Sequence, residues 1–351
     1  MQAAFSSSRI AGIAAAVPRR ALDLVHYAPQ WGASDVANII RNTGITHVRI
    51  APEGTTTADL CCAAVAPLLS ALNVDTAAID GVVFVSQTSD YIMPATSTVI
   101  QHRLGLSRKV AAFDINYGCS GYIYGLLQAD MLIQSGMCRS VLVLAGDTTT
   151  RLVNSRDRAL RMLFGDAGSA TLVVQGDARH TYSVRTDGSG ATSLIIPAGG
   201  ARQPRSTETG VEKAGEDGNY RSAENLFMDG IAVLYMALRD VPETIAEATA
   251  LAGWNDEKPA FYGLHQANRF MIDYLARKLG SSAGSTPFSC ADVGNAGPAS
   301  IPVMLAREYP RLCAEQRLGR SALCGFGVGF SVAAMTVPLD RTTTLPLIEV
   351  D

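Results

Sequence analysis

Short apolar runs rich in valine, isoleucine and alanine alternate along the chain with longer stretches in which apolar residues recur at helical spacing. The runs that predict buried strands are 10–17, 81–86, 110–115, 140–145 and 169–174, followed by 260–263, 322–324 and 331–337. Helical patterns begin near residues 57, 96, 121, 226, 266 and 299. This alternation is typical of an α/β protein.

One stretch, residues 199–225, departs from this alternation. It contains five glycines and many charged residues but almost no large apolar ones. A loop of this length is usually functional or disordered. We therefore expect either a cover over a site or a disordered segment.

Composition excludes several classes of protein. The chain has 351 residues, of which 48% are hydrophobic, enough for one large core or two fused ones. A formal net charge of -3 without any long basic stretch argues against a nucleic-acid partner. No run approaches the ~20 apolar residues of a membrane helix, so no membrane partner is expected.

The apolar run 10–17 lacks a basic leader, which favours a first strand over a signal peptide. Seven cysteines without a C-x-x-C pair point to a reducing cytoplasm.

Cys119 lies between the predicted strand 110–115 and the helix that begins near residue 121. Small neighbouring residues allow a sharp turn, and the first free amides of the helix would point toward the sulfur. Because the positive end of a helix lowers the pKa of a thiol, we expect a thiolate nucleophile here. The alternative is the ordinary one, a cysteine buried as a small apolar residue.

Two further corners offer partners for such a thiol. His265 follows the predicted strand 260–263 and would stand at a helix entrance, where the helix dipole keeps the ring neutral. Asn295 lies in a turn rich in glycine and proline, just before another predicted helix. A lone histidine or asparagine in a turn is usually structural, so a chance trio stays open at this point.

Taken in order, the motifs of the chain resemble those of the ketoacyl synthase III family, the 3-oxoacyl-acyl carrier protein synthases III. The matching segments are Asn42-Thr43-Gly44-Ile45, Gly118-Cys119-Ser120-Gly121-Tyr122, Phe164-Gly165-Asp166-Ala167-Gly168, His265-Gln266-Ala267-Asn268, Gly294-Asn295 and Gly325-Phe326-Gly327-Val328-Gly329. The resemblance implies a thiolase-like fold, a five-layer αβαβα sandwich of two duplicated β/α halves. We expect residues 1–178 to carry the cysteine, and residues 179–351 the histidine and asparagine.

The resemblance also implies a reaction. Cys119 would take an acyl group from a thioester, and the amides of Cys119 and Val328 would hold the oxyanion. His265 and Asn295 would then act on a malonyl thioester, which loses carbon dioxide and condenses to a 3-oxoacyl product. No metal or redox cofactor is expected.

Substrate contacts are implied in the same way. Arg158 matches a nucleotide-contacting arginine, and Asn268 matches a residue that positions the pantetheine arm. Met93, before a proline, matches a residue that limits acyl length across the interface of a homodimer. Coenzyme A or acyl carrier protein would deliver the thioesters. The chain departs from the family at Ile231, Tyr235 and Phe270, which puts the usual carrier-protein docking in doubt.

Three alternatives remain. His265 could serve as general base in an ester- or amide-forming acyltransferase without decarboxylation. The chain could be a non-catalytic partner subunit, although such subunits typically lose the thiol. Cys324 could be the second cysteine of a thiolase, but its glycines are shifted by one residue, so we interpret it as a packing residue.

Overall fold

The computed structural model describes residues 1–254 and 257–351. The principal strands in this part of the chain are β1 (Gln2–Pro18), β4 (Gly81–Val85), β5 (Ala111–Ile115), β6 (Ser140–Asp147), β7 (Ala167–Gln175), β8 (Ala178–Thr186), β13 (Phe261–Leu264), β14 (Ser321–Gly327) and β15 (Ser331–Val337). Short strands are β2 (Ala21–Asp23), β3 (His47–Arg49), β9 (Leu194–Ile195), β10 (Lys213–Ala214), β11 (Tyr220–Arg221), β12 (Phe227–Met228), β16 (Thr343–Thr344) and β17 (Ile348–Val350). The helices are α1 (Ala28–Trp31), α2 (Ala33–Thr43), α3 (Thr57–Leu72), α4 (Thr96–Arg103), α5 (Gly121–Gln134), α6 (Arg158–Arg161), α7 (Gly230–Leu251), α8 (Arg269–Leu279) and α9 (Ser300–Ala314).

The sheet repeats one pairing pattern on either side of β1. On one side β4 pairs with β6 in parallel, β6 with β7 antiparallel, and β7 with β1 antiparallel. On the other side β13, β14, β15 and β8 pair in the same sequence, one parallel pair followed by two antiparallel pairs. Strand β1 joins the two sides, because its first residues pair with β8 and its later residues with β7. We propose from this repetition that residues 1–178 and 179–351 form the two duplicated halves.

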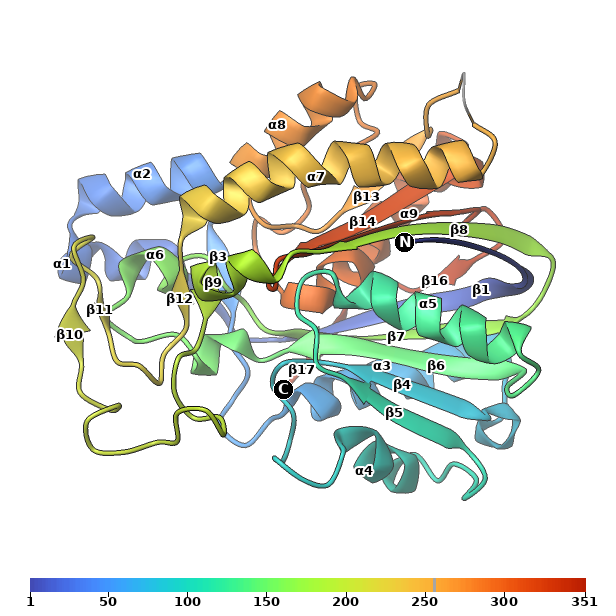
Figure 1. Cartoon of the computed structure of the whole chain (residues 1–351), viewed down its shortest axis with the longest axis horizontal. Helices are drawn as coiled ribbons and strands as arrows, with labels where there is room; N and C mark the ends of the chain where they lie inside the picture. Colours follow the sequence, from blue (N-terminus) through green and yellow to red (C-terminus); the bar gives the residue numbers. More distant parts are fainter. Residues whose placement is uncertain (255–256) are drawn as a thin grey trace.

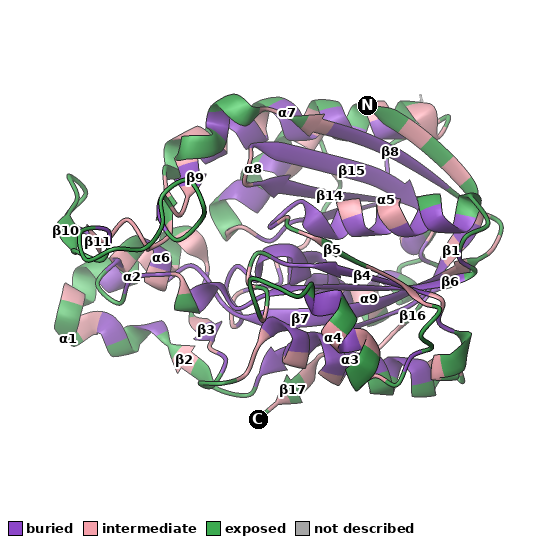
Figure 2. Cartoon of the chain, turned by 60° about the horizontal axis from the view of Figure 1, so that its bottom comes forward, coloured by how far each residue is buried: buried purple, intermediate pink, exposed green. Residues whose placement is uncertain are grey.

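Helices separate and cover the two sides of the sheet (Figure 1). Side chains of α5 and α9 pack in one core cluster with strands from both sides, so these two helices form a central layer. Helix α3 packs on the outer face of the β4–β7 side, and α7 and α8 pack on the outer face of the β13–β15 side. Most strands between the helices are buried, whereas β5, at one end of the sheet, has no buried residue (Figure 2). The molecule therefore has five layers, in the order αβαβα.

The predicted α/β elements are present, with differences at their ends. Strand β1 extends well before residue 10, because its first residues pair with β8, a strand that the hydrophobic pattern did not predict. Helix α7 begins at Gly230 and not near 226, because Phe227–Met228 pair with β9 and the Asp229 carboxylate caps the helix. Among helices in the described residues, none is long and apolar enough to cross a bilayer.

A buried carboxylate fastens β1, α5 and β8 together. Asp130, on α5, accepts hydrogen bonds from Ser8 Oγ at 2.7 Å and Tyr182 Oη at 2.6 Å, and it faces His180 Nδ1 at 2.8 Å. Asp130 and His180 are each only 1% exposed. A buried charge is tolerated only when it is paired and hydrogen-bonded, so this cluster stabilises the junction of the two sides.

Residues 199–225 form an exposed, irregular excursion that includes the β10–β11 hairpin (Figure 2). The excursion is attached to the body by Arg221, whose guanidinium pairs with the buried Asp157, and by Tyr220, whose ring lies under the Arg156 guanidinium. Gly199, Gly200 and Arg205 line a cavity beside Cys119. The arrangement supports the expected cover.

Candidate active site

Cys119 lies in the turn between β5 and α5, as the sequence predicts. The Gly121 amide donates to the Gly118 carbonyl at 2.7 Å, which closes the turn around the cysteine. The next residue, Ser120, contacts Ser331 at 2.6 Å between hydroxyl oxygens, and Ser331 Oγ donates to the Val328 carbonyl at 2.8 Å. This chain of hydroxyls holds the Val328 peptide beside the cysteine turn.

The glycines of β14 allow that strand to approach the cysteine closely. A Cβ atom at Gly327 would lie 2.8 Å from Cys119 Cβ and 2.9 Å from its sulfur. At Gly325 a Cβ would lie 2.7 Å from the Cys119 carbonyl oxygen. Both contacts are shorter than packed carbon atoms tolerate. The glycine-rich motif is therefore required by packing against Cys119, and it brings the Val328 amide to the sulfur.

His265 follows β13 and is almost completely buried, at 1% exposure. Its amide donates to the Cys324 carbonyl at 2.8 Å, and its Nδ1 lies 2.7 Å from Ser300 Oγ. The edge of Phe326 packs against the ring, with 5.4 Å between the ring centroids. One ring nitrogen is thus engaged by Ser300, and the residue lines a small cavity beside Cys119.

Asn295 occupies the turn before α9. The preceding Gly294 has φ +87°, a conformation that favours glycine, and the Asn295 amide donates to the Leu163 carbonyl at 2.8 Å. A Cβ at Gly165 would lie only 1.8 Å from the Val293 carbonyl oxygen. Only glycine at position 165 therefore leaves room for the turn that carries Asn295. Asn295 Oδ1 accepts from the Gly297 amide at 3.1 Å, which leaves the NH2 group available to donate.

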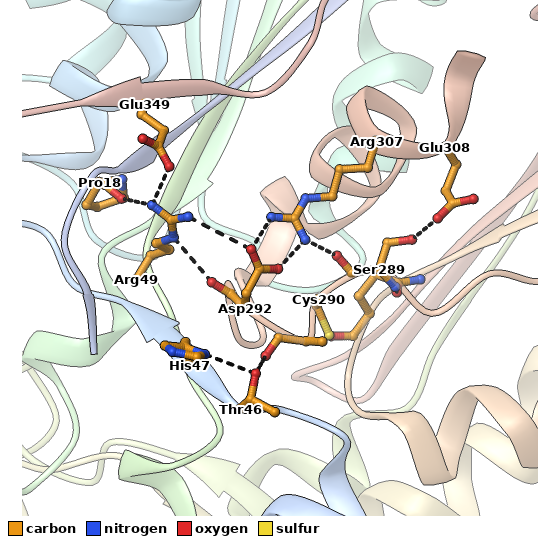
Figure 3. Close-up of polar contacts among 12 residues, drawn as sticks. Pro18, Thr46, His47, Arg49, Ser289, Cys290, Asp292, Arg307, Glu308 and Glu349 are labelled. Carbon is orange, nitrogen blue, oxygen red and sulfur yellow. Dashed lines mark hydrogen bonds and ion pairs between the residues drawn. The ribbon is translucent and has the colours of Figure 1, made fainter. Parts of the chain in front are cut away.

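A network of charged residues anchors the segment before Asn295 (Figure 3). The Arg49 guanidinium donates to the carbonyls of Asp292 at 3.2 Å and Pro18 at 3.0 Å, and to Glu349 Oε1 at 2.8 Å. Arg307 Nη2, on α9, donates to Asp292 Oδ2 at 2.8 Å. Because these donors hold both the backbone and the side chain of Asp292, they restrict the position of the asparagine turn.

The three predicted residues meet in one cavity. A small cavity of about 70 Å³ is lined by Cys119, His265 and Asn295 together. A larger cavity of about 680 Å³ also reaches Cys119 and is lined by Val328. The cysteine therefore lies between two cavities.

Electrostatics at the cysteine differ from the prediction. Burial and, to a smaller extent, the charge of Asp147 raise the pKa of the Cys119 thiol to about 12, against the opposing effect of the amides of Cys119 and Val328. This direction is opposite to the expected thiolate, because burial favours the neutral thiol. Burial also raises the pKa of Asp147 itself to about 6.

The prediction of a neutral His265 is confirmed, but for a different reason. Burial lowers the pKa of the imidazole to about 3, although the Gly297 carbonyl acts in the opposite direction. Helix α8 begins only at Arg269, so the ring does not stand at the entrance of that helix, and its Nδ1 instead faces Ser300, the first residue of α9. Desolvation is the main cause that keeps the ring uncharged.

The remaining predicted residues lie in different settings. Asn268 lines the small cavity, and its carboxamide oxygen also caps α8 by accepting from the Met271 amide. Arg158 lines neither cavity, because its guanidinium pairs with Asp35 at 2.6 Å. Met93 is 81% exposed and lies outside both cavities, whereas its neighbour Ile92 lines the larger one.

Sequence reasoning missed Ser300 and Ser331, which touch His265 and the Val328 loop. Their only signal was a serine at the start of α9 and another after the glycine motif. Cys324 is fully buried in the cluster of β14, α7 and α8 and lines neither cavity near Cys119. Its interpretation as a packing residue agrees with this position.

Comparisons with known proteins agree with the geometry. Residues 113–193 match the family described as 3-oxoacyl-[acyl-carrier-protein] synthase III, and residues 250–339 match its C-terminal domain. A beta-ketoacyl-[acyl-carrier-protein] synthase III from Streptomyces coelicolor is 31% identical over 341 residues, covering 95% of this chain and 98% of that protein. The chain belongs to the 3-oxoacyl-acyl carrier protein synthase III family.

Solved structures extend the similarity to three dimensions. A 3-oxoacyl-(acyl-carrier protein) synthase from Burkholderia xenovorans has 34% sequence identity and a TM-score of 0.91, with coverage of 100% of this chain and 99% of that one. A priming beta-ketosynthase of the R1128 polyketide pathway has 29% identity and a TM-score of 0.78, with 97% of each chain covered. The predicted family and thiolase-like fold are confirmed.

Proposed function

We propose that this synthase III forms a 3-oxoacyl thioester in two steps through Cys119. The observation that carries the proposal is the convergence of Cys119, a neutral His265 and Asn295 on one cavity. In the first step the sulfur attacks an acyl thioester. The amides of Cys119 and Val328 stabilise the oxyanion, the carrier thiol leaves with a proton, and the acyl group stays on sulfur.

In the second step a malonyl thioester loses carbon dioxide to give an enolate. The enolate carbon forms a bond to the acyl carbon while the bond to Cys119 sulfur breaks, which regenerates the cysteine. Hydrogen-bond donors to the enolate oxygen lower the barrier to decarboxylation. Each donor raises the rate by about 10²- to 10³-fold. The Asn295 NH2 group and His265 Nε2–H suit this task.

Ser300 supports the required tautomer of His265. Ser300 Oγ accepts a hydrogen bond from the Gln266 amide at 3.3 Å, so its own proton is available for His265 Nδ1. An Nδ1 that accepts leaves the ring proton on Nε2. The ring would then donate to the substrate, as decarboxylation requires.

We further propose that coenzyme A or acyl carrier protein delivers the thioesters and that the protein works in the cytoplasm. We also propose that two copies form a homodimer through β5. Strand β5 lies at one end of the sheet order, and Phe113 on it is 39% exposed. Tyr91, Ile92 and Met93, in the loop after β4, are also exposed. Apolar side chains gathered at a sheet edge favour an interface between copies.

Intact-protein mass spectrometry tests the chemistry. Incubation with a panel of acyl-coenzyme A thioesters should add one acyl mass, and malonyl thioester should then remove it with release of carbon dioxide. Cys119→Ala should abolish the adduct, whereas replacing the exposed Cys313 by alanine should not.

An adduct that survives Cys119→Ala would refute the assigned nucleophile. Transfer of the acyl group to an alcohol or amine without malonyl would instead establish the ester- or amide-forming alternative, with His265 as base.

A further inference from the structure

The larger cavity beside Cys119 is polar where parallel strands end. Gln87 follows β4, Asn116 follows β5, and Asp147 ends β6. Since β4 pairs in parallel with both β5 and β6, the carboxyl ends of these strands meet at one edge of the sheet. All three residues line the cavity together with Cys119.

Two carboxamides face this cavity with free hydrogen-bonding groups. The Gln87 main chain is fixed, because its amide donates to Asp147 Oδ1 at 2.7 Å. The side chains of Gln87 and Asn116 are exposed, and within residues 1–254 and 257–351 neither carboxamide has a hydrogen-bond partner. Each could both donate to and accept from a bound group.

A glycine makes room for Gln87 beside the cysteine. A Cβ at Gly118 would lie 2.4 Å from Gln87 Oε1 and 3.7 Å from Val328 Cγ2. Without a side chain at 118, the Gln87 carboxamide rests against the residue that immediately precedes Cys119. It therefore lies beside the cysteine turn, in the cavity that an acyl group on the sulfur would enter.

The outer wall of the same cavity is apolar. Ile92 lines it, and so do Leu194, Ile195, Ile196 and Leu226 from the stretches that flank residues 199–225. The cavity volume is about 680 Å³. A ligand that matches it would be polar close to the sulfur and hydrocarbon farther away.

We propose that the acyl group loaded on Cys119 carries a hydroxyl or carbonyl oxygen near the thioester, recognised by Gln87 and Asn116. This inference rests on the proposed function, because it specifies the substrate of that reaction. An unsubstituted acyl chain packed against the two exposed carboxamides would displace their water without replacing its hydrogen bonds, which costs free energy. Sites that hydrogen-bond a substrate group discriminate strongly against the analogue that lacks it.

Rates of acylation with a matched pair of thioesters test the inference. Hexanoyl-coenzyme A and 3-hydroxyhexanoyl-coenzyme A differ by one hydroxyl, and mass spectrometry follows the adduct on the purified protein. We expect the hydroxylated acyl group to load about tenfold faster. Gln87→Leu should bring the ratio close to one, while the control Gln134→Leu, at an exposed site on α5, should keep it.

A second variant, Gly118→Ala, provides an independent test in case Gln87→Leu does not fold. Gly118→Ala places a methyl group where the Gln87 carboxamide lies and should also lower the ratio. Equal loading of the two thioesters by the wild-type protein, or a ratio that both variants leave intact, would overturn polar recognition while Cys119 acylation stands. Absence of any adduct on Cys119 would overturn the proposed function itself.

Discussion

Two opposing physical effects determine the pKa of the Cys119 thiol. The rate of its alkylation by iodoacetamide shows which effect dominates. A helix terminus favours the thiolate, whereas burial and Asp147 favour the thiol and raise its pKa to about 12 from an ordinary 9.0. At pH 8 the thiolate fraction would then be about 0.01%, against roughly 10% for an ordinary thiol. Alkylation of Cys119 should therefore be about 10³-fold slower than that of an unperturbed cysteine.

The pH profile provides the sharper assay. Since the thiolate is the reactive form, the alkylation rate should rise about tenfold per pH unit from pH 7 to 10 without a plateau. Asp147, with a pKa of about 6, is already ionised over this range and adds no inflection. Asp147→Asn removes a negative charge near the sulfur, so alkylation at pH 8 should become faster.

Peptide-level mass spectrometry assigns the modified residue. A protein in which the exposed Cys313 is replaced by alanine gives a cleaner signal. A plateau below pH 8 would show that the thiolate is already dominant there. The helix terminus and the two amides would then outweigh desolvation, and our reasoning about the resting state would be refuted.

Three further variants probe the site and the core. Ser300→Ala should slow decarboxylation at least tenfold, because Ser300 no longer holds His265 in the tautomer with its proton on Nε2. Acylation, measured by adduct mass, should stay near the wild-type rate, and equal losses in both steps would contradict this prediction. Gly327→Ala should block acylation and lower stability by about 1–3 kcal/mol in thermal unfolding, whereas Gly319→Ala, with open space around its Cβ, should change neither. Asp130→Ala should cost about 3 kcal/mol or more in urea unfolding, since it strips buried donors of their acceptor, and a loss below about 1 kcal/mol would rule out that account.

Much of the fold could be predicted because its strands and helices have distinct local patterns. Strands such as β4 and β6 are buried on both faces and appear as continuous apolar runs. Strand β8 was missed because its sequence, ARHTYSVRT, is polar, and its histidine and tyrosine are accommodated only by a carboxylate on α5. Nothing within the strand itself indicates that partner.

The residue types of the site were also predictable, since cysteine, histidine and asparagine each stand in a turn after or before a regular element. Their convergence depends on contacts between segments far apart in the chain, such as Arg49 with Asp292. The tertiary structure added Ser300 as the partner of His265, and it pairs Arg158 with Asp35, a contact that the sequence did not indicate.

The sequence by itself determined which groups can react and the order of the elements that carry them. The tertiary structure decided their protonation, because desolvation of Cys119 and His265 is a sum over atoms from many distant segments. It also decided the purpose of the glycines in β14, which is visible only where that strand passes the cysteine at van der Waals distance. Local patterns report on neighbours along the chain, whereas burial and close approach depend on neighbours in space.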